Sequence, residues 1–193
     1  MGKIPTREEA FALLKSYNES DSLIKHALAV EGVMRHYAEK YGEDVEKWGM
    51  IGLIHDLDYE KFPDQHCVKV VEILRENDVD EDIIHAVASH GYGICSDVKP
   101  EHVMELVLYT TDELTGLITA AALMRPSKSV MDLEYKSVIK KYKTATFAAG
   151  VDRGIIEKGC ELLGTDLQSV INDVILGMRG VATEIGMDMR VES

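Results

Sequence analysis

Proline, cysteine and positive charge are all scarce in this chain of 193 residues. Only four prolines interrupt it, and apolar residues recur every three or four positions along runs rich in Ala, Leu, Glu and Lys. Few prolines and this spacing are typical of helices, so we expect an all-α protein without a substantial sheet. With 46% apolar residues, the chain is long enough to bury a hydrophobic core.

Lysine and arginine number 21 against 34 acidic residues, which gives a formal net charge of −13. A surface that binds nucleic-acid polymers needs clustered cations to neutralise the phosphates. We therefore expect no nucleic-acid polymer as a partner. A small anionic substrate stays open, provided that its site supplies cations.

The three cysteines, Cys67, Cys95 and Cys160, are odd in number and form no CxxC pair. This pattern predicts neither a disulfide framework nor a zinc knuckle, and it favours the cytoplasm. The first residues carry acids where a signal peptide has its apolar segment, and no stretch approaches 18 uninterrupted apolar residues. We expect a cytoplasmic protein that neither spans nor anchors to a membrane.

Capping residues and glycines mark the ends of the expected helices. Helices should follow Thr6, Ser20 and the aspartates at 44, 64 and 80, and a longer one should cover 101–124 before Pro126. Three more are expected at about 132–149, 152–163 and 165–185. We expect Pro126 to divide a core of residues 1–125 from a C-terminal helical extension of residues 126–193. The extension should pack on the same domain and serve as a homodimer surface or as a lid.

Spacing along these helices sorts the histidines into inward and outward positions. His26 repeats with Val30 on an apolar stripe, whereas His36 lies among charged residues. By the same criterion His90 faces inward and His85 outward. The inward histidines are candidates to bind a metal, although each of them alone is more often a hydrogen-bonded core residue.

Two aspartates and two more histidines join the inward set. His55 and Asp56 end an apolar segment together, and Asp112 lies within a long apolar helix, where its charge needs a partner. Imidazole and carboxylate groups are the ligands that Mn, Fe, Co, Ni and Zn accept. We expect one or two divalent transition-metal ions, held by His26, His55, Asp56, His66, His90 and Asp112.

The order of His26, the His55-Asp56 pair and a distant Asp112 resembles the HD superfamily of metal-dependent phosphohydrolases, which are helical bundles named for the dipeptide. The resemblance covers about residues 20–115, and it implies an HD-domain bundle followed here by additional C-terminal helices. The stretches DELTGLITAAALMRPSK and KKYKTATFAAGVDR are similar to a group of small prokaryotic HD-domain proteins described as predicted hydrolases. Leu57-Asp58 replaces the Ile-Gly of the HDIG variant, and the Gly-Tyr-Pro signature of the cyclic-di-GMP branch is absent.

The resemblance implies a phosphohydrolase in which metal-activated hydroxide attacks a small phosphorylated, nucleotide-like substrate. Asp56 would bridge two ions, with His66 and His90 on the second, while Asp58 and Lys61 would orient ligands or protonate the leaving oxygen. Helical spacing also indicates a positive stripe that could receive a phosphate or an acidic partner; it consists of Lys136, Lys140, Lys143 and Arg153. Two alternatives stay open: an HD-type di-iron oxygenase, and a non-catalytic domain that binds a ligand or partner.

Overall fold

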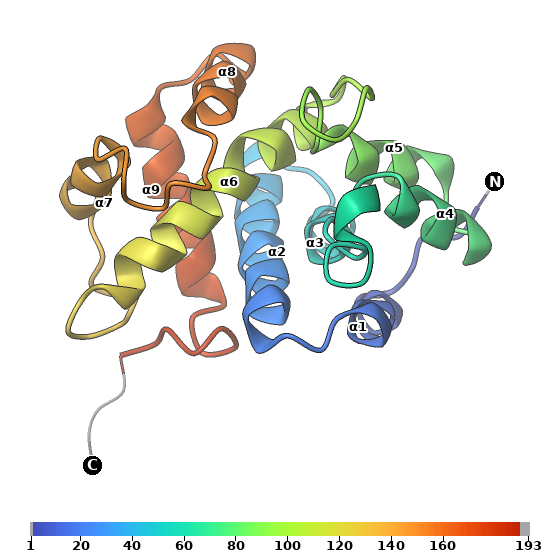
Figure 1. Cartoon of the computed structure of the whole chain (residues 1–193), viewed down its shortest axis with the longest axis horizontal. Coiled ribbons are helices and arrows are strands. Elements are labelled where there is room, and N and C mark those ends of the chain that lie inside the picture. The colour runs from blue at the N-terminus through green and yellow to red at the C-terminus, as the bar shows by residue number, and fades with distance from the viewer. Residues whose placement is uncertain (1, 190–193) are drawn as a thin grey trace.

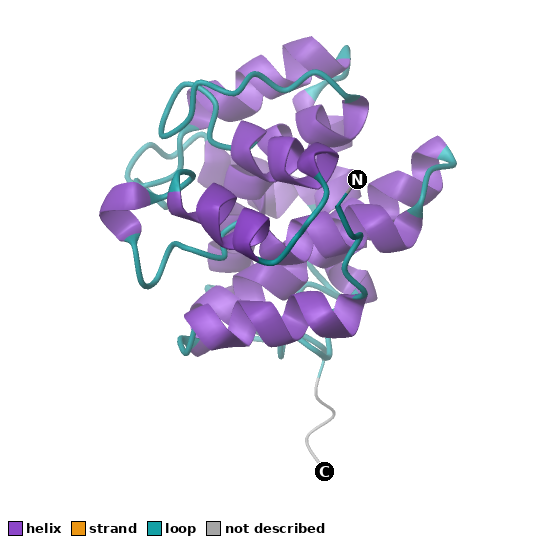
Figure 2. Cartoon of the chain, turned by 90° about the vertical axis from the view of Figure 1, so that its right-hand side faces the viewer, coloured by secondary structure: helices purple, strands orange, loops and turns teal. Residues whose placement is uncertain are grey.

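The structure is a computed structural model that describes residues 2–189. Within that range the chain forms α-helices joined by loops and turns, with no β-strand beyond two isolated bridges (Figure 2). The all-α prediction is confirmed. The helices are α1 (Arg7–Tyr17), α2 (Asp21–Tyr41), α3 (Val45–Ile54), α4 (Lys69–Glu76), α5 (Glu81–Ser89), α6 (Val103–Leu123), α7 (Tyr135–Tyr142), α8 (Arg153–Leu163) and α9 (Leu167–Gly180).

Most helices begin and end where capping residues predict. Thr6 accepts a hydrogen bond from the backbone N–H of Glu9, whose carboxylate accepts one from the N–H of Thr6, and this capping box starts α1. Gly42 ends α2 in the left-handed conformation, with φ 72°, and Asp44 caps α3 through the N–H of Lys47. Local chemistry therefore sets these boundaries.

Two predicted helices are wrong. Asp64 caps no helix, because residues 63–65 form a short 3₁₀ turn and α4 begins only at Lys69. The carboxylate of Asp58 instead accepts from the N–H of Val70 and so caps α4 from outside the helix. The helix expected at 132–149 is reduced to α7, which ends at Tyr142 and is followed by a series of turns.

Helix α2 runs through the middle of the molecule (Figure 1). It packs on α3 on one side and on α9 on the other, and α6 crosses in front of it. The approach of α2 to α9 is close: an added Cβ at Gly32 would lie 2.7 Å from the carbonyl oxygen of Gly177. Residues after Pro126 thus contribute α9 directly to the packing around α2.

Helix α6 is long and apolar enough to cross a membrane by those two criteria alone. In the fold, however, 61% of the apolar segment of this helix is buried. It packs chiefly against α8, α2 and α9. Its middle also carries Asp112, which faces α2 and the end of α3. Packing within the described chain therefore accounts for its apolar character.

Candidate metal centre

Five segments bring the six predicted ligands to one place. His26 lies in the second turn of α2, and Asp112 lies in the middle of α6. The remaining four follow the ends of short helical segments, where the chain leaves the helix axis and side chains can converge: His55 and Asp56 after α3, His66 after the 3₁₀ turn, and His90 after α5. The sequence predicted a helix after Asp64, with His66 in its first turn. In the structure His66 instead lies in a turn.

The first group of ligands consists of two imidazoles and two carboxylates. His26, His55, Asp56 and Asp112 each offer one ligand atom, and these atoms all lie within 4.8 Å of one another. The Oδ1 atom of Asp112 lies 2.9 Å from His26 Nε2 and 3.2 Å from His55 Nε2. Four nitrogen and oxygen donors at this spacing can surround a divalent transition-metal ion.

Asp56 faces two groups of histidines, one with each carboxylate oxygen. Its Oδ2 atom lies 3.4 Å from His55 Nε2 and 3.7 Å from His26 Nε2. Its Oδ1 atom lies 3.3 Å from His90 Nε2 and 3.5 Å from His66 Nε2. A carboxylate placed in this way can bridge two ions, one on each side.

Hydrogen bonds fix the tautomers of three of the histidines. In each ring Nδ1 contacts an oxygen that can only accept, so Nδ1 carries a hydrogen and Nε2 is the atom that faces Asp56 and that a metal would bind in place of a proton. The contacts are His55 to the Gly52 carbonyl at 2.7 Å, His90 to the Val87 carbonyl at 2.5 Å, and His66 to Asp58 Oδ1 at 2.7 Å. The rings are thus oriented as metal ligands usually are.

The charges of the cluster support each other. Burial works to lower the pKa of His55, but the carboxylates of Asp56 and Asp112 outweigh burial and hold that pKa well above its usual value. Burial likewise works to raise the pKa of Asp56, and the neighbouring His55 and His90 hold it well below its usual value. The pKa of Asp112 is held below its usual value in the same way, by His55 and His26. The carboxylates therefore stay ionised, which is the form that binds cations.

Of the roles expected of Asp58 and Lys61, the structure shows one, the orientation of the candidate ligand His66 by Asp58. Asp58 is fully buried, and its two oxygens accept from His66 Nδ1 and from the N–H of Val70, so it orients a ligand and does not meet the substrate. Lys61 donates to the carbonyl of Ser16 at 2.6 Å and lies over the ring of Tyr17. Neither lines the cavity beside the histidines.

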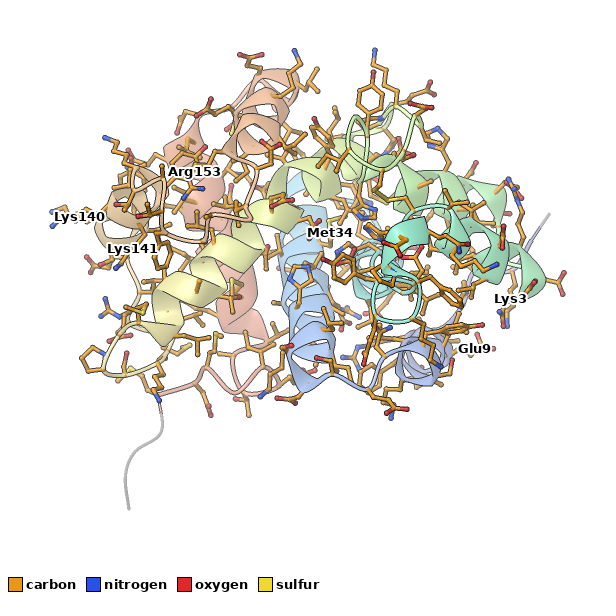
Figure 3. All side chains as sticks on the ribbon, viewed as in Figure 1. Lys3, Glu9, Met34, Lys140, Lys141 and Arg153 are labelled. Atoms are coloured by element: carbon orange, nitrogen blue, oxygen red, sulfur yellow. A yellow bond between two sulfur atoms is a disulfide. The ribbon has the colours of Figure 1, made fainter. Side chains whose placement is uncertain are left out.

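The positive stripe lies away from the candidate site. Lys136, Lys140 and Lys143 are exposed on α7, and Figure 3 shows Lys140 at the outer edge of the molecule, on the side opposite to Lys3. Arg153 donates to several backbone carbonyls between residues 142 and 151 and so holds that turn together. None of these four residues lines the cavity. The prediction failed because helical spacing identifies the residues that share a face but not the part of the molecule that the face points toward.

A cavity of about 360 Å³ opens beside the ligands. Beyond the candidate ligands, its wall is largely apolar and aromatic. It also includes the carboxyl group of Glu113, and burial raises the pKa of this group. The wall includes Tyr59 and Glu113, which lie close to Asp56 and Asp112 in the sequence. It also includes four residues that sequence analysis did not identify, because only the fold shows that they face the candidate ligands: Ile94, Tyr109, Val151 and Ile155.

The two histidines assigned to the surface, His36 and His85, are partly buried, and each contacts a carboxylate. His36 lies 3.0 Å from the carboxylate of Asp173 on α9, and His85 lies 2.7 Å from that of Glu105 on α6. The prediction that His36 simply faces water is therefore wrong. Both histidines lie outside the two groups of candidate ligands.

Cys67 and Cys95 are joined by a disulfide, with their Cα atoms 6.0 Å apart. This corrects the expectation of three unpaired cysteines. The two residues are separated by 28 positions, so no local spacing signals the pair. Cys160 keeps a buried free thiol.

Comparisons with known proteins agree with this geometry. The family model described as HD domain matches residues 23–121. A tRNA (cytidine(56)-2'-O)-methyltransferase of Picrophilus torridus is 25% identical over 175 residues, which is 89% of this chain and 51% of that protein. Ribonuclease Y of Nitratidesulfovibrio vulgaris is 27% identical over 101 residues, covering 50% of this chain and 18% of the enzyme.

The chain thus spans about half, or much less, of the length of these relatives. A Ribonuclease Y of Lawsonia intracellularis adds a match of 23% identity over 140 residues, covering 70% of this chain and 26% of that protein. The HD domain model, by contrast, covers just over half of the chain and includes all six candidate ligands. The chain belongs to the HD domain family.

Proposed function

We propose that this chain is a metal-dependent phosphohydrolase that cleaves a small phosphorylated, nucleotide-like substrate with the help of one or two divalent transition-metal ions. HD domains are typically metal-dependent hydrolases, and the candidate ligands fit that activity. The observation that carries the proposal is the position of Asp56, with Oδ2 toward one pair of imidazoles and Oδ1 toward another.

The donor set fits one or two such ions. His26, His55, Asp56 and Asp112 would hold the first, and Asp56 would share the second with His66 and His90. Three of the four imidazoles are already fixed in the tautomer that directs Nε2 at the site. Bound ions would polarise a phosphoryl oxygen and lower the pKa of a water molecule, so that hydroxide would be available near neutral pH.

The protein's own groups would position the reactants. Asp58 holds the His66 ring in place, and the cavity of about 360 Å³ offers room for a small molecule directly beside the ligands. Tyr59 and Tyr109 supply aromatic surface for the part of the substrate beyond its phosphate. The chain's net charge of −13 favours a small substrate over a nucleic-acid polymer, although the relatives' names refer to enzymes of RNA.

The test begins with protein purified without added metal, kept reduced with a phosphine, and then loaded with Mn²⁺, Fe²⁺, Co²⁺, Ni²⁺ or Zn²⁺. Hydrolysis of p-nitrophenyl phosphate, bis(p-nitrophenyl) phosphate and nucleotides is measured together with the metal content. We expect about two ions per chain, falling toward one in His66→Ala and in His90→Ala. His85→Ala is the matched control, because His85 lies outside both groups.

Three outcomes would contradict parts of the proposal. One ion per chain, unchanged by either substitution, would leave a mononuclear site formed by the first group. Consumption of dioxygen by the iron-loaded protein, without phosphoester cleavage, would favour the oxygenase alternative. Bound metal with neither activity would favour a domain that binds a ligand or partner.

A further inference from the structure

Cys67 lies directly beside the second group of ligands. The sulfur atom of Cys67 and one ring nitrogen each from His66 and His90 lie within 4.8 Å of one another. Cys67 is nearly buried and adopts φ 67°, a left-handed conformation that is uncommon for a residue with a Cβ atom. Such backbone conformations are found disproportionately at functional sites.

The partner sulfur comes from the turn that follows His90. The carbonyl of Gly91 accepts hydrogen bonds from the backbone N–H groups of Ile94, Cys95 and Ser96, which makes the turn compact. A methyl group at Gly91 would overlap the sulfur atoms of both Cys67 and Cys95, so the absence of a side chain there allows the two to meet. The disulfide thus joins the two segments that carry His66 and His90.

We propose that Cys67 supplies a thiolate ligand to the second ion when the cysteines are reduced, and that the disulfide with Cys95 withdraws this ligand. The sulfur forms one group with His66 and His90, and Asp56, whose Oδ1 atom lies 3.5 Å and 3.3 Å from Nε2 of these two histidines, would supply a fourth donor. Four is the number that Zn²⁺ prefers and that Co²⁺ and Fe²⁺ also accept. Occupancy of the second position then follows the oxidation state of the pair. The inference rests on the proposed dinuclear site.

Formation of the disulfide from two thiols removes two electrons, and hydrogen peroxide is an oxidant that can accept them. Cys95 lines the cavity and is partly exposed, so its thiol is the group that peroxide reaches. The thiol takes one oxygen atom from peroxide to become a sulfenic acid and releases one water. The Cys67 thiolate then attacks that sulfur, forms the S–S bond and releases hydroxide, so two electrons pass from the two sulfurs to peroxide.

Cobalt reports the proposed ligand directly, because a thiolate bound to Co²⁺ gives an intense charge-transfer absorption in the near ultraviolet. Metal-free protein is loaded with Co²⁺ under a phosphine reductant, the phosphine is removed, and the protein is then treated with hydrogen peroxide. Cobalt per chain, the near-ultraviolet band and the number of titratable thiols are measured in both states. In the reduced protein we expect two Co²⁺ and the band; after peroxide we expect loss of the band, of two thiols, and of about one Co²⁺.

Single substitutions separate the roles of the cysteines. Cys67→Ser should lack the band in both states and bind the second Co²⁺ at least about tenfold more weakly. Cys95→Ser should keep the band and, having no partner sulfur, form no intramolecular disulfide. Cys160→Ser is the matched control and should behave as the unmodified chain, because Cys160 is the buried thiol outside the pair.

The unmodified protein alone can overturn the inference, even if a variant fails to fold. Two Co²⁺ per chain without a charge-transfer band in the reduced state would show that Cys67 is no ligand, while the dinuclear site would stand. A band that persists after the two thiols are lost would equally exclude Cys67. A single Co²⁺ in both states, with no band, would instead contradict the dinuclear site itself.

Discussion

Asp58 holds His66 with one carboxylate oxygen and the start of α4 with the other. We predict that Asp58→Asn weakens binding of the second ion by about 10- to 100-fold, because an amide is a poorer acceptor for His66 and would place its NH₂ group against a donor. The first ion should bind as before. Stepwise metal titration with competing chelators measures both affinities.

Asp64→Asn is the control for this change. Asp64 is exposed in the 3₁₀ turn beside the site and caps no helix. If it weakens the second ion as much as Asp58→Asn does, general charge and not the contact with His66 would be the cause.

The sequence identifies the candidate ligands better than it identifies the residues that contact them. The six candidates can be picked out because histidines and aspartates at inward positions are unusual, and because the His55-Asp56 pair resembles a known family. Asp58, Lys61 and Arg153 are charged too, yet their partners are the ring of His66 and the backbone carbonyls of Ser16 and Phe147. Helical spacing contains no information about such partners.

At the scale of elements, Arg153 at the start of α8 connects the helix to the turn before it. It donates to the carbonyls of Tyr142, Phe147 and Val151, and Val151 lines the cavity. We predict that Arg153→Ala raises KM for a hydrolysed phosphoester several-fold and leaves the metal content unchanged, because the cavity wall loosens while the ligands stay in place. Lys140→Ala, on the exposed face of α7, should change neither.

If Lys140→Ala raised KM as much as Arg153→Ala does, the positive stripe would bind the phosphate after all, as the sequence predicted. Steady-state kinetics beside elemental analysis of both variants decides this.

The contact between α2 and α9 tests the role of the C-terminal residues. A Cβ atom at Gly177 would lie 2.5 Å from the Cα atom of Val33, so the two helices would have to separate. We predict that Gly177→Ala lowers the free energy of unfolding by about 1–3 kcal/mol, as overpacking usually does. Gly180→Ala, one turn further along α9 with nothing within 4 Å of its added Cβ, should leave stability unchanged or raise it slightly.

Chemical denaturation measures this pair of variants. Equal stability of the two would mean that α9 moves away from α2 at little cost. Residues 126–193 would then be a loosely attached extension.

Element boundaries were predictable where the cap is local and wrong where it is not. Thr6, Asp44 and Asp80 cap the helices that immediately follow them. The start of α4 depends on Asp58, which is 11 residues before Lys69, so no short sequence pattern could place it. The Cys67–Cys95 pair has the same character, because it depends on where two separate turns meet.

For the whole molecule, the candidate metal centre joins segments that are otherwise far apart in the chain: α2, the ends of α3 and α5, the turn at His66, and α6. An ion that binds the folded chain and not the unfolded chain stabilises it by mass action, by about 2.7 kcal/mol at a free concentration 100 times its Kd. We predict that chelation lowers Tm by several degrees and that re-addition of the ion restores it.

The size of this shift should depend on the ligands and not on histidine content. His90→Ala removes one ligand of the second group, so it should shrink the metal-dependent rise in Tm, whereas His85→Ala should leave the rise as in the unmodified chain. Calorimetry of the three proteins, each with and without metal, makes the comparison. An equal metal-dependent rise in Tm in all three proteins would mean that the ion stabilises the fold from a site that does not include His90. The approach of His90 to Asp56 would then have to be explained without a metal.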